Sequence, residues 1–267
     1  MKGRCSVKAF AIVNRKGGVG KTTTAVNLAY VLATSCRLRV LLVDCDGQAN
    51  ATQILLPRGE YAGLGALLRG WACCYADLVE HTDVDGLDVL PASEDLWALD
   101  IEAAGGDRGR CYRAIRDMRE ALEEDDAYDV MVMDCPPNLG ASCVSAILAS
   151  DGIIVPVLSD ACSATGVGDL VDQIASLRSL RPDLRVSGVL VNQWHRSPVV
   201  EGSVEYLRKE GHIPVYDTVI RRTDKVPESS WARMAVQAWS PFCSAARDYR
   251  ALASELAEKE GIRNEEA

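Results

Sequence analysis

A glycine-rich stretch near the start of the chain, NRKGGVGKTTT, has the residue types that bind a polyphosphate. Glycines let backbone N–H groups point toward an anion, and a helix that follows adds the positive end of its dipole. Gly17, Gly18 and Gly20 would supply this backbone, and Lys21 would neutralise the β and γ phosphates of a nucleoside triphosphate. Thr22 would place its hydroxyl on Mg²⁺. The stretch therefore predicts a nucleotide phosphate site.

The same loop departs from the usual pattern G-x-x-x-x-G-K-[ST] in two places. Arg15 stands where the pattern has its first glycine, and Lys16 is a second lysine. A second ammonium beside one triphosphate would repel Lys21 unless both groups face an anion. We infer that Lys16 reaches a phosphate held by another subunit, and the alternative is a lysine exposed on the loop.

Two aspartates end apolar runs downstream of the loop. Asp44 lies in VLLVDCDGQAN and Asp134 in YDVMVMDCPP. An aspartate at the end of a buried strand is where a carboxylate can hold Mg²⁺, often through water, and we assign this role to Asp134. Asp44 is a second candidate for a functional carboxylate, and the alternative is that it only caps the end of a strand.

Apolar runs and helix-forming stretches alternate along the chain. The runs are near-continuous in Val, Ile, Leu and Met, as in strands that are buried on both faces. This order predicts an α/β fold with a mostly parallel, twisted sheet and helices on both faces. The expected strands lie in 9–14, 39–46, 87–93, 128–137, 151–160, 185–193 and 215–220, and the expected helices in 22–34, 108–123, 166–180 and 243–260. A single domain over 1–267 is expected, with a disordered tail over about 261–267.

Composition limits the class of protein. Of the 267 residues, 48% are hydrophobic, so a large core can form. The net charge of −9 argues against a chain that is basic throughout, although a local basic patch remains possible. The N-terminus does not resemble a signal peptide and no apolar run reaches transmembrane length, so we expect a cytoplasmic protein without a membrane partner. The ten cysteines are then expected to be reduced, inert thiols and not metal ligands.

The stretch KGGVGKTT resembles the deviant Walker A motif of the ParA/MinD ATPases, and the resemblance extends over about residues 8–256. It implies a P-loop NTPase-type fold, ATP and Mg²⁺ as cofactors, and a homodimer that sandwiches two ATP molecules. Lys16 matches the signature lysine that reaches the partner's nucleotide. Asp44 matches the carboxylate that orients the attacking water, although Gly47 replaces a proline and Ala49 a glycine of that motif.

The resemblance also implies the rest of the site. The segment DTVIRRTDKVPES resembles T-x-I-P-R-N-x-x-x-x-E, with Arg221 in place of the proline that contributes to the adenine pocket. Asn192 matches a position that often reads the adenine edge, and Arg222 keeps the arginine of the segment. The predicted catalytic residues are Lys16, Lys21 and Asp44. The predicted nucleotide-binding residues are Lys16, Gly17, Gly18, Val19, Gly20, Lys21, Thr22, Thr23, Asn192 and Arg222, and the predicted Mg²⁺ ligands are Thr22, Asp44 and Asp134.

Charge distribution favours the DNA-partitioning branch of the family, close to small, Soj-like ParA proteins. Residues 176–225 hold nine Lys or Arg and six Asp or Glu, a net of +3, while the remainder of the chain is −12. Such a local excess is typical of phosphate contacts, although ordinary solvated side chains are the alternative. The predicted DNA-binding residues are Arg196, Arg221 and Lys225. Since no helix-turn-helix segment precedes the loop, binding is expected to be non-specific and the protein nucleoid-associated.

We therefore expect a weak ATPase that partitions a plasmid or chromosome and is stimulated by a ParB-like centromere-binding protein. No arginine finger is identifiable in the motifs, which predicts slow hydrolysis. The alternative is a nucleotide switch that positions a protein cargo or mobile-element machinery without DNA. The acidic end ELAEKEGIRNEEA argues against MinD-like lipid binding, and the cysteine settings argue against the cluster-bridging iron proteins of the family.

Overall fold

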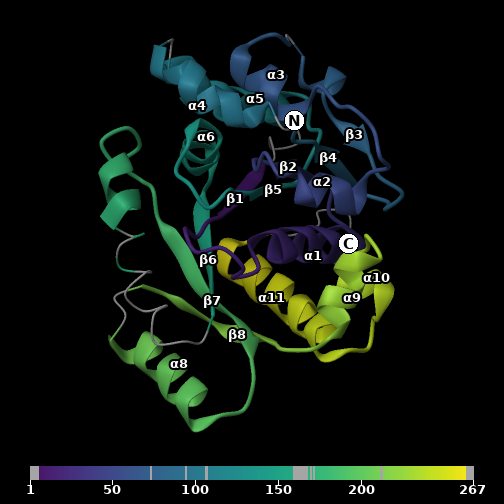
Figure 1. Ribbon diagram of the computed structural model, residues 1–267, viewed down its shortest axis with the longest axis vertical. Helices are drawn as coiled ribbons and strands as arrows, with labels where there is room; N and C mark the ends of the chain where they lie inside the picture. The colour runs from purple at the N-terminus through teal and green to yellow at the C-terminus, as the bar shows by residue number, and fades with distance from the viewer. Residues whose placement is uncertain are drawn as a thin grey trace.

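The computed structural model describes residues 6–262 except 73, 94, 106–107, 159–167, 169, 171 and 211–212. Eight strands form one sheet in the order β3-β4-β2-β5-β1-β6-β7-β8, and every neighbouring pair is parallel except β3 and β4 (Figure 1). The strands are β1 (Lys8–Ile12), β2 (Val40–Asp44), β3 (Glu80–His81), β4 (Leu87–Leu90), β5 (Val130–Asp134), β6 (Gly152–Leu158), β7 (Val186–Trp194) and β8 (Val215–Arg221). The prediction of a mostly parallel sheet is confirmed.

Helices cover both faces of the sheet, as the alternating pattern predicted (Figure 1). One face carries α3 to α6 and the other carries α1, α2, α10 and α11. The helices are α1 (Lys21–Thr34), α2 (Asn50–Leu55), α3 (Gly63–Arg69), α4 (Leu96–Gly105), α5 (Arg108–Glu124), α6 (Ala141–Ala149), α8 (Pro198–Glu210), α9 (Lys225–Trp231), α10 (Val236–Trp239) and α11 (Ser244–Glu260), with a short 3₁₀ turn at Tyr75–Asp77.

Alternation along each strand divides the core into two layers. In β1, Ala9 and Ala11 face the layer under α3 to α6, whereas Phe10 and Ile12 face α1 and α11. All four side chains are fully buried. Because successive side chains of a strand point to opposite faces, a run that is apolar at every position is the signature of a sheet covered on both sides.

Two expectations fall partly outside the described residues. The helix expected over 166–180 is seen only in part, with residues 172–177 helical. The tail expected to be disordered over about 261–267 is described only at its first two positions. There Gly261 ends α11 in a left-handed conformation, and Ile262 packs against the core.

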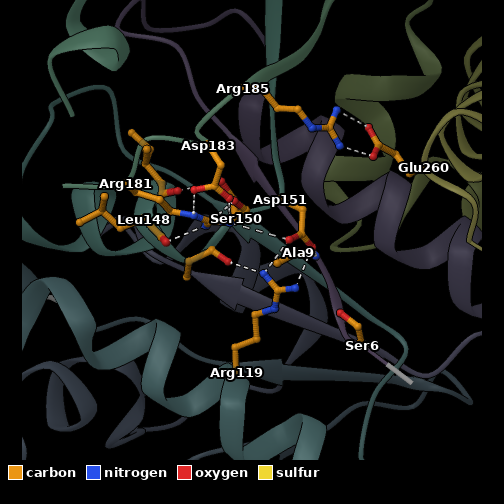
Figure 2. A network of polar contacts seen from close by, with 12 residues as sticks. Ser6, Ala9, Arg119, Leu148, Ser150, Asp151, Arg181, Asp183, Arg185 and Glu260 are labelled. Atoms are coloured by element: carbon orange, nitrogen blue, oxygen red, sulfur yellow. Dashed lines mark hydrogen bonds and ion pairs between the residues drawn. The ribbon is translucent and has the colours of Figure 1, made fainter. Parts of the chain in front are cut away.

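The amino-terminal edge of the sheet is closed by a network of arginines and carboxylates (Figure 2). Asp151 accepts the backbone N–H of Ala9 at 2.9 Å and pairs with the Arg119 guanidinium at 2.8 Å. Arg119 and Arg181 also donate to backbone carbonyls at the end of α6, at Ala149 (2.9 Å) and at Leu148 (2.8 Å). The network thus ties α5 and α6 to the start of β1.

The carboxyl ends of the parallel strands meet at the opposite edge of the sheet. Asp44 at the end of β2 is the register partner of Asp134 at the end of β5, which in turn pairs with Ile12 at the end of β1. The loop after β1 leads into α1 at this same edge. The fold therefore brings together the glycine-rich loop and both candidate carboxylates.

Candidate nucleotide site

The glycine-rich loop is held in shape by a side chain that the sequence argument did not single out. Asn14 donates from Nδ2 to the carbonyl of Pro156 in β6 at 2.7 Å, and its Oδ1 accepts the backbone N–H of Lys16 at 2.9 Å. Asn14 is 8% exposed. Its amide therefore fixes the loop to the neighbouring strand before any ligand binds. A polar residue directly after an apolar run was the only available signal for it.

Glycine is required at the end of the loop, where α1 begins. Gly20 has φ of 88°, a left-handed conformation, and a Cβ there would lie 2.8 Å from Nδ2 of Asn192. Asn192, near the end of β7, donates to the carbonyl of Val19 at 2.8 Å and to the Thr24 hydroxyl at 3.2 Å. The predicted Asn192 thus lies against the loop, together with Val19 and Gly20.

The lysine that follows the glycine is buried beneath the loop. Lys21 is 8% exposed, and its Nζ donates to the carbonyl of Lys16 at 3.3 Å. Burial lowers the pKa of Lys21, while the nearby carboxylate of Asp134 acts in the opposite direction. An ammonium in this position has a strong electrostatic interaction with any anion that enters the loop, because little water screens it.

The two aspartates form a fully buried pair with unequal surroundings. Asp44 accepts the backbone N–H and the hydroxyl of Thr52, both at 2.8 Å, at its Oδ2. Neither carboxylate oxygen of Asp134 has a hydrogen-bond partner within the part of the chain that the structure describes. Burial and the adjacent Asp44 raise the pKa of Asp134, whereas Thr22 and Lys21 oppose this rise. Burial likewise raises the pKa of Asp44 against the bonds from Thr52.

Thr52 is a second residue that the sequence argument missed. Its hydroxyl also accepts the backbone N–H of Ala92 at 3.0 Å, so that it links Asp44 to the segment after β4. Thr52 lies in α2, six residues beyond Asp46, and no motif position pointed to it. The link joins the end of β2 to the segment that follows β4, the next strand in the sheet order.

The donor set fits a magnesium ion. Mg²⁺ prefers oxygen ligands and is usually bound by one or two carboxylates together with substrate phosphates, keeping several waters. Asp134 offers two buried oxygens that have no hydrogen-bond partner among the described residues, next to the Thr22 hydroxyl at the start of α1. Across the described residues no group of three or more His, Cys, Asp or Glu is arranged to hold a metal alone. The site therefore suits a metal that arrives with phosphates.

A cavity of about 630 Å³ continues from the loop along the carboxyl ends of β7 and β8. Its wall includes four of the predicted nucleotide-binding residues, Val19, Gly20, Thr23 and Asn192, and also the predicted Arg222. Asn192 is 3% exposed, and its Oδ1 has no partner among the described residues. A buried acceptor at the wall of a cavity is suited to a ligand that carries an N–H donor.

Lys16 and Arg15 belong to a different hollow. Both are exposed, and both line a second cavity of about 550 Å³ together with Pro137, Asn138 and Gln173. The loop therefore directs Lys21 into the interior and places Lys16 on the outer side. This placement is the one that the two-lysine argument required, although its use between subunits stays a prediction.

The basic residues of 176–225 do not form one patch. Arg185 precedes β7 and pairs with Glu260 (Figure 2). Arg196 instead follows β7. Nine residues of strand, at about 3.3 Å each, separate them by roughly 30 Å. Arg181 is likewise committed to the amino-terminal network. The excess of +3 therefore overstates the charge that any one surface presents.

The three predicted DNA-binding residues differ in their surroundings. Arg196 is 90% exposed, with Glu201 at 3.8 Å, and Lys225 pairs with Glu228 at 2.7 Å. Arg221 instead holds Asp248 through its guanidinium at 2.5 to 3.1 Å and lines the 630 Å³ cavity. Arg196 and Lys225 both lie at the carboxyl edge, since they follow the neighbouring strands β7 and β8. Arg221 is thus engaged within the chain, while DNA contact by any of the three stays a prediction.

The expectation of reduced, inert cysteines stays a prediction. Cys36, Cys45, Cys74, Cys111, Cys135, Cys143 and Cys243 are all free. Two of them, Cys45 and Cys135, are buried directly after the two aspartates of the site. No helix in the described part of the chain has the length and apolar character needed to cross a membrane.

Three features define a P-loop nucleoside triphosphatase. They are a parallel sheet, a glycine-rich loop between its central strand and a helix, and carboxylates at the ends of two neighbouring strands. Comparison with known proteins agrees. Residues 7–186 match an AAA domain family. The chain is 37% identical over 255 residues to the chromosome-partitioning ATPase Soj of Thermus thermophilus, with 95% of this chain and 96% of that protein covered.

Two further similarities extend the comparison. The chain is 36% identical to the chromosome partitioning protein ParA of Caulobacter vibrioides, with 98% of each covered. A solved cobyrinic acid a,c-diamide synthase of Mycobacterium smegmatis, bound to an ATP analogue and magnesium, shares the fold with a TM-score of 0.79 at 28% identity, covering 96% and 97% of the two chains. The chain belongs to the Soj/ParA family of partitioning ATPases.

Proposed function

We propose that this chain is an ATP-driven partitioning switch that dimerises on ATP and binds DNA in that state. The observation that carries the proposal is the buried pair of Asp44 and Asp134 facing Lys21, with both oxygens of Asp134 unpartnered among the described residues. Leaving a carboxylate buried without hydrogen bonds is costly, and a bound Mg²⁺ with a triphosphate would compensate that cost.

The residues of the site would divide the work of phosphoryl transfer to water. The backbone N–H groups of the loop and Lys21 bind the phosphates, and Thr22 and Asp134 hold Mg²⁺, which neutralises charge on the phosphate oxygens when it is bound. Asp44 is held in one orientation by the two bonds from Thr52 at Oδ2 and by the backbone N–H of Asp46, which donates to Oδ1 at 3.2 Å. We assign to this carboxylate the orientation of the attacking water.

ATP is the proposed nucleotide because of the cavity beside the loop. The unpartnered Oδ1 of Asn192 is a hydrogen-bond acceptor, and the exocyclic amine of adenine is a donor, whereas guanine presents a carbonyl at that position. The ATP-analogue and magnesium complex of the M. smegmatis protein supports the same choice.

The switch is tested by two variants that act on opposite sides of the loop. Asp44→Ala should retain ATP, lose most hydrolysis and accumulate as a dimer, because the carboxylate positions water but does not hold the phosphates. Lys16→Ala should bind ATP as a monomer and fail to dimerise. Size-exclusion chromatography with ATP and Mg²⁺ checks both. An Asp44→Ala protein that stays monomeric with ATP bound, or a Lys16→Ala protein that still dimerises, contradicts the assignment.

DNA binding is proposed for the dimer at the edge that carries Arg196 and Lys225. Each subunit has few free cations on an acidic body, so doubling the contacts should increase affinity steeply and make it strongly dependent on salt. A gel shift with non-specific duplex, ATP and the Asp44→Ala protein measures it. Adding Arg196→Glu and Lys225→Glu should abolish the shift and leave dimerisation intact, with Lys209→Glu on α8 as the matched control.

Partner stimulation completes the proposal. The relatives Soj and ParA are partitioning proteins, which supports a ParB-like DNA-bound partner that accelerates a slow intrinsic hydrolysis. A dimer that forms on ATP but gives no DNA shift at low salt would favour the second candidate, a switch that positions a protein cargo without DNA.

A further inference from the structure

The lining of the 630 Å³ cavity includes apolar side chains from β8 and α9. They are Ile220 at the end of β8 and Val226, Pro227 and Trp231 of α9. Val19, Gly20 and Thr23, from the phosphate loop and the start of α1, line the same cavity. A flat ligand that extends from the loop would therefore meet hydrophobic side chains of β8 and α9.

Trp231 is the largest of these apolar side chains and the least buried. It is 92% exposed, although it ends α9 and lines the cavity. The neighbouring helix positions are anchored, since the Ser229 hydroxyl donates to the carbonyl of Val226 at 2.9 Å and Ser229 is 2% exposed. The indole therefore projects from a fixed helix end at the mouth of the cavity.

Arg221, a long side chain that also lines the cavity, is already engaged within the chain. Arg221 donates to Asp248 through Nε and Nη2, and its backbone N–H binds the same carboxylate at 2.9 Å. Its guanidinium is consequently held toward α11. Among the described residues that line the cavity, the indole of Trp231 and the phenol ring of Tyr249 are the two aromatic groups, and Tyr249 is only 1% exposed.

We propose that Trp231 closes over the purine ring of the bound nucleotide and is the main source of base affinity. The inference rests on the proposed ATP site and adds a specificity-determining residue to it. Asn192 fixes one edge of the base through its unpartnered Oδ1, and the indole covers a face. Stacking an aromatic ring on a base removes exposed surface from both groups. Stacking does not depend on hydrogen bonds at the edge of the base.

The test separates base binding from phosphate binding. Calorimetry with Mg²⁺ compares ATP with inorganic tripolyphosphate on the full chain, for wild type and for Trp231→Ala. ATP affinity should fall about tenfold, which corresponds to about 1.4 kcal/mol, and tripolyphosphate affinity should stay within about twofold. Trp231→Phe should restore most of the ATP affinity. Phe242→Ala removes another exposed aromatic side chain that does not line the cavity, so it should bind ATP as wild type does.

Fluorescence gives a second readout that a general structural effect would not reproduce. ATP should quench tryptophan emission of the wild type, tripolyphosphate should not, and the quench should disappear in Trp231→Phe although four tryptophans remain of the five. Hydrolysis by Trp231→Ala should show a raised KM with an unchanged kcat.

Four results would overturn the inference: unchanged ATP affinity in Trp231→Ala, equal losses for ATP and tripolyphosphate, the same loss in Phe242→Ala, or a quench that persists in Trp231→Phe. A wild-type protein that binds neither ligand would instead remove the proposed nucleotide site, and the inference with it.

Discussion

The two edges of the sheet differ in how their carboxylates are paired. At the amino-terminal edge, Asp151 is met by Arg119, by the N–H of Ala9 and, at 3.9 Å, by Arg181. At the carboxyl edge, Asp134 is buried with neither oxygen bonded to any described residue. The first arrangement is complete within one chain, and its charges stabilise the fold. The second has no hydrogen-bond partner among the described residues, and under the proposed function Mg²⁺ and a triphosphate would complete it. The difference distinguishes structural charge from functional charge without reference to any motif.

Removing the buried cation of the carboxyl edge should have the largest effect. Lys21→Ala should weaken ATP binding by about 100-fold, because the phosphates lose their principal desolvated cation and each tenfold corresponds to 1.4 kcal/mol. Calorimetry with ATP and Mg²⁺ measures this loss. Lys209→Ala, an exposed lysine paired with Glu205 on α8, is the control and should bind as wild type does. ATP affinity within about threefold of wild type would contradict the phosphate role of Lys21.

Breaking the amino-terminal edge should reduce stability and leave nucleotide affinity unchanged. Asp151→Ala leaves Arg119, whose side chain is 12% exposed, without its main partner, so the free energy of unfolding should fall by about 2 kcal/mol. Asp183→Ala removes a carboxylate that is 70% exposed and should cost under about 0.5 kcal/mol. Urea unfolding followed by circular dichroism gives both values. Equal losses in the two variants would show that the network is no stronger than an ordinary surface pair.

Neutralising Asp134 should have the smallest effect of the three changes on the ligand-free protein. It should increase the free energy of unfolding instead of lowering it. Asp134→Asn should stabilise the ligand-free protein by about 1 kcal/mol at neutral pH, because the amide avoids the cost of keeping a buried carboxyl group protonated where the unfolded chain ionises it. Burial raises the pKa of Asp134, so the folded wild type retains a proton that the unfolded chain releases. Wild-type stability should therefore fall relative to the variant as pH rises above the unfolded value of about 3.9.

Unfolding in urea over a series of pH values, without nucleotide or Mg²⁺, checks this prediction. A variant that is less stable than wild type at every pH would mean that Asp134 already has a partner in the chain. The two edges would then not differ in the way described.

The sequence predicted those parts of the site that depend on local pattern. Asp44 and Asp134 were found because an apolar run that ends in an acid places that acid at a strand end, and parallel strands share one edge. Asn14 and Thr52 could not be found in this way. Their roles depend on Pro156 and Ala92, which are 142 and 40 residues away along the chain, and only tertiary packing brings them together.

Net charge over a segment was the weaker guide. The net charge of residues 176–225 includes both Arg185 and Arg196, although these residues lie at opposite ends of β7 and so at opposite edges of the sheet. Interactions between charges weaken with distance, and β7 places its two ends farther apart than the screening length of physiological salt. The helix boundaries, in contrast, follow from periodic apolar positions, and α5 and α11 begin and end within one residue of the predicted ranges.

The brace that Asn14 forms between Pro156 and the amide of Lys16 has a consequence for nucleotide exchange. A loop that is already ordered spends no binding energy on folding around its ligand, and this applies to any ligand with a phosphate chain. ADP would find the same prepared cradle as ATP. Preorganisation of the loop therefore does not itself favour ATP over ADP, and under the proposed function any difference in affinity comes from Lys21 and the other groups that would contact the last phosphate.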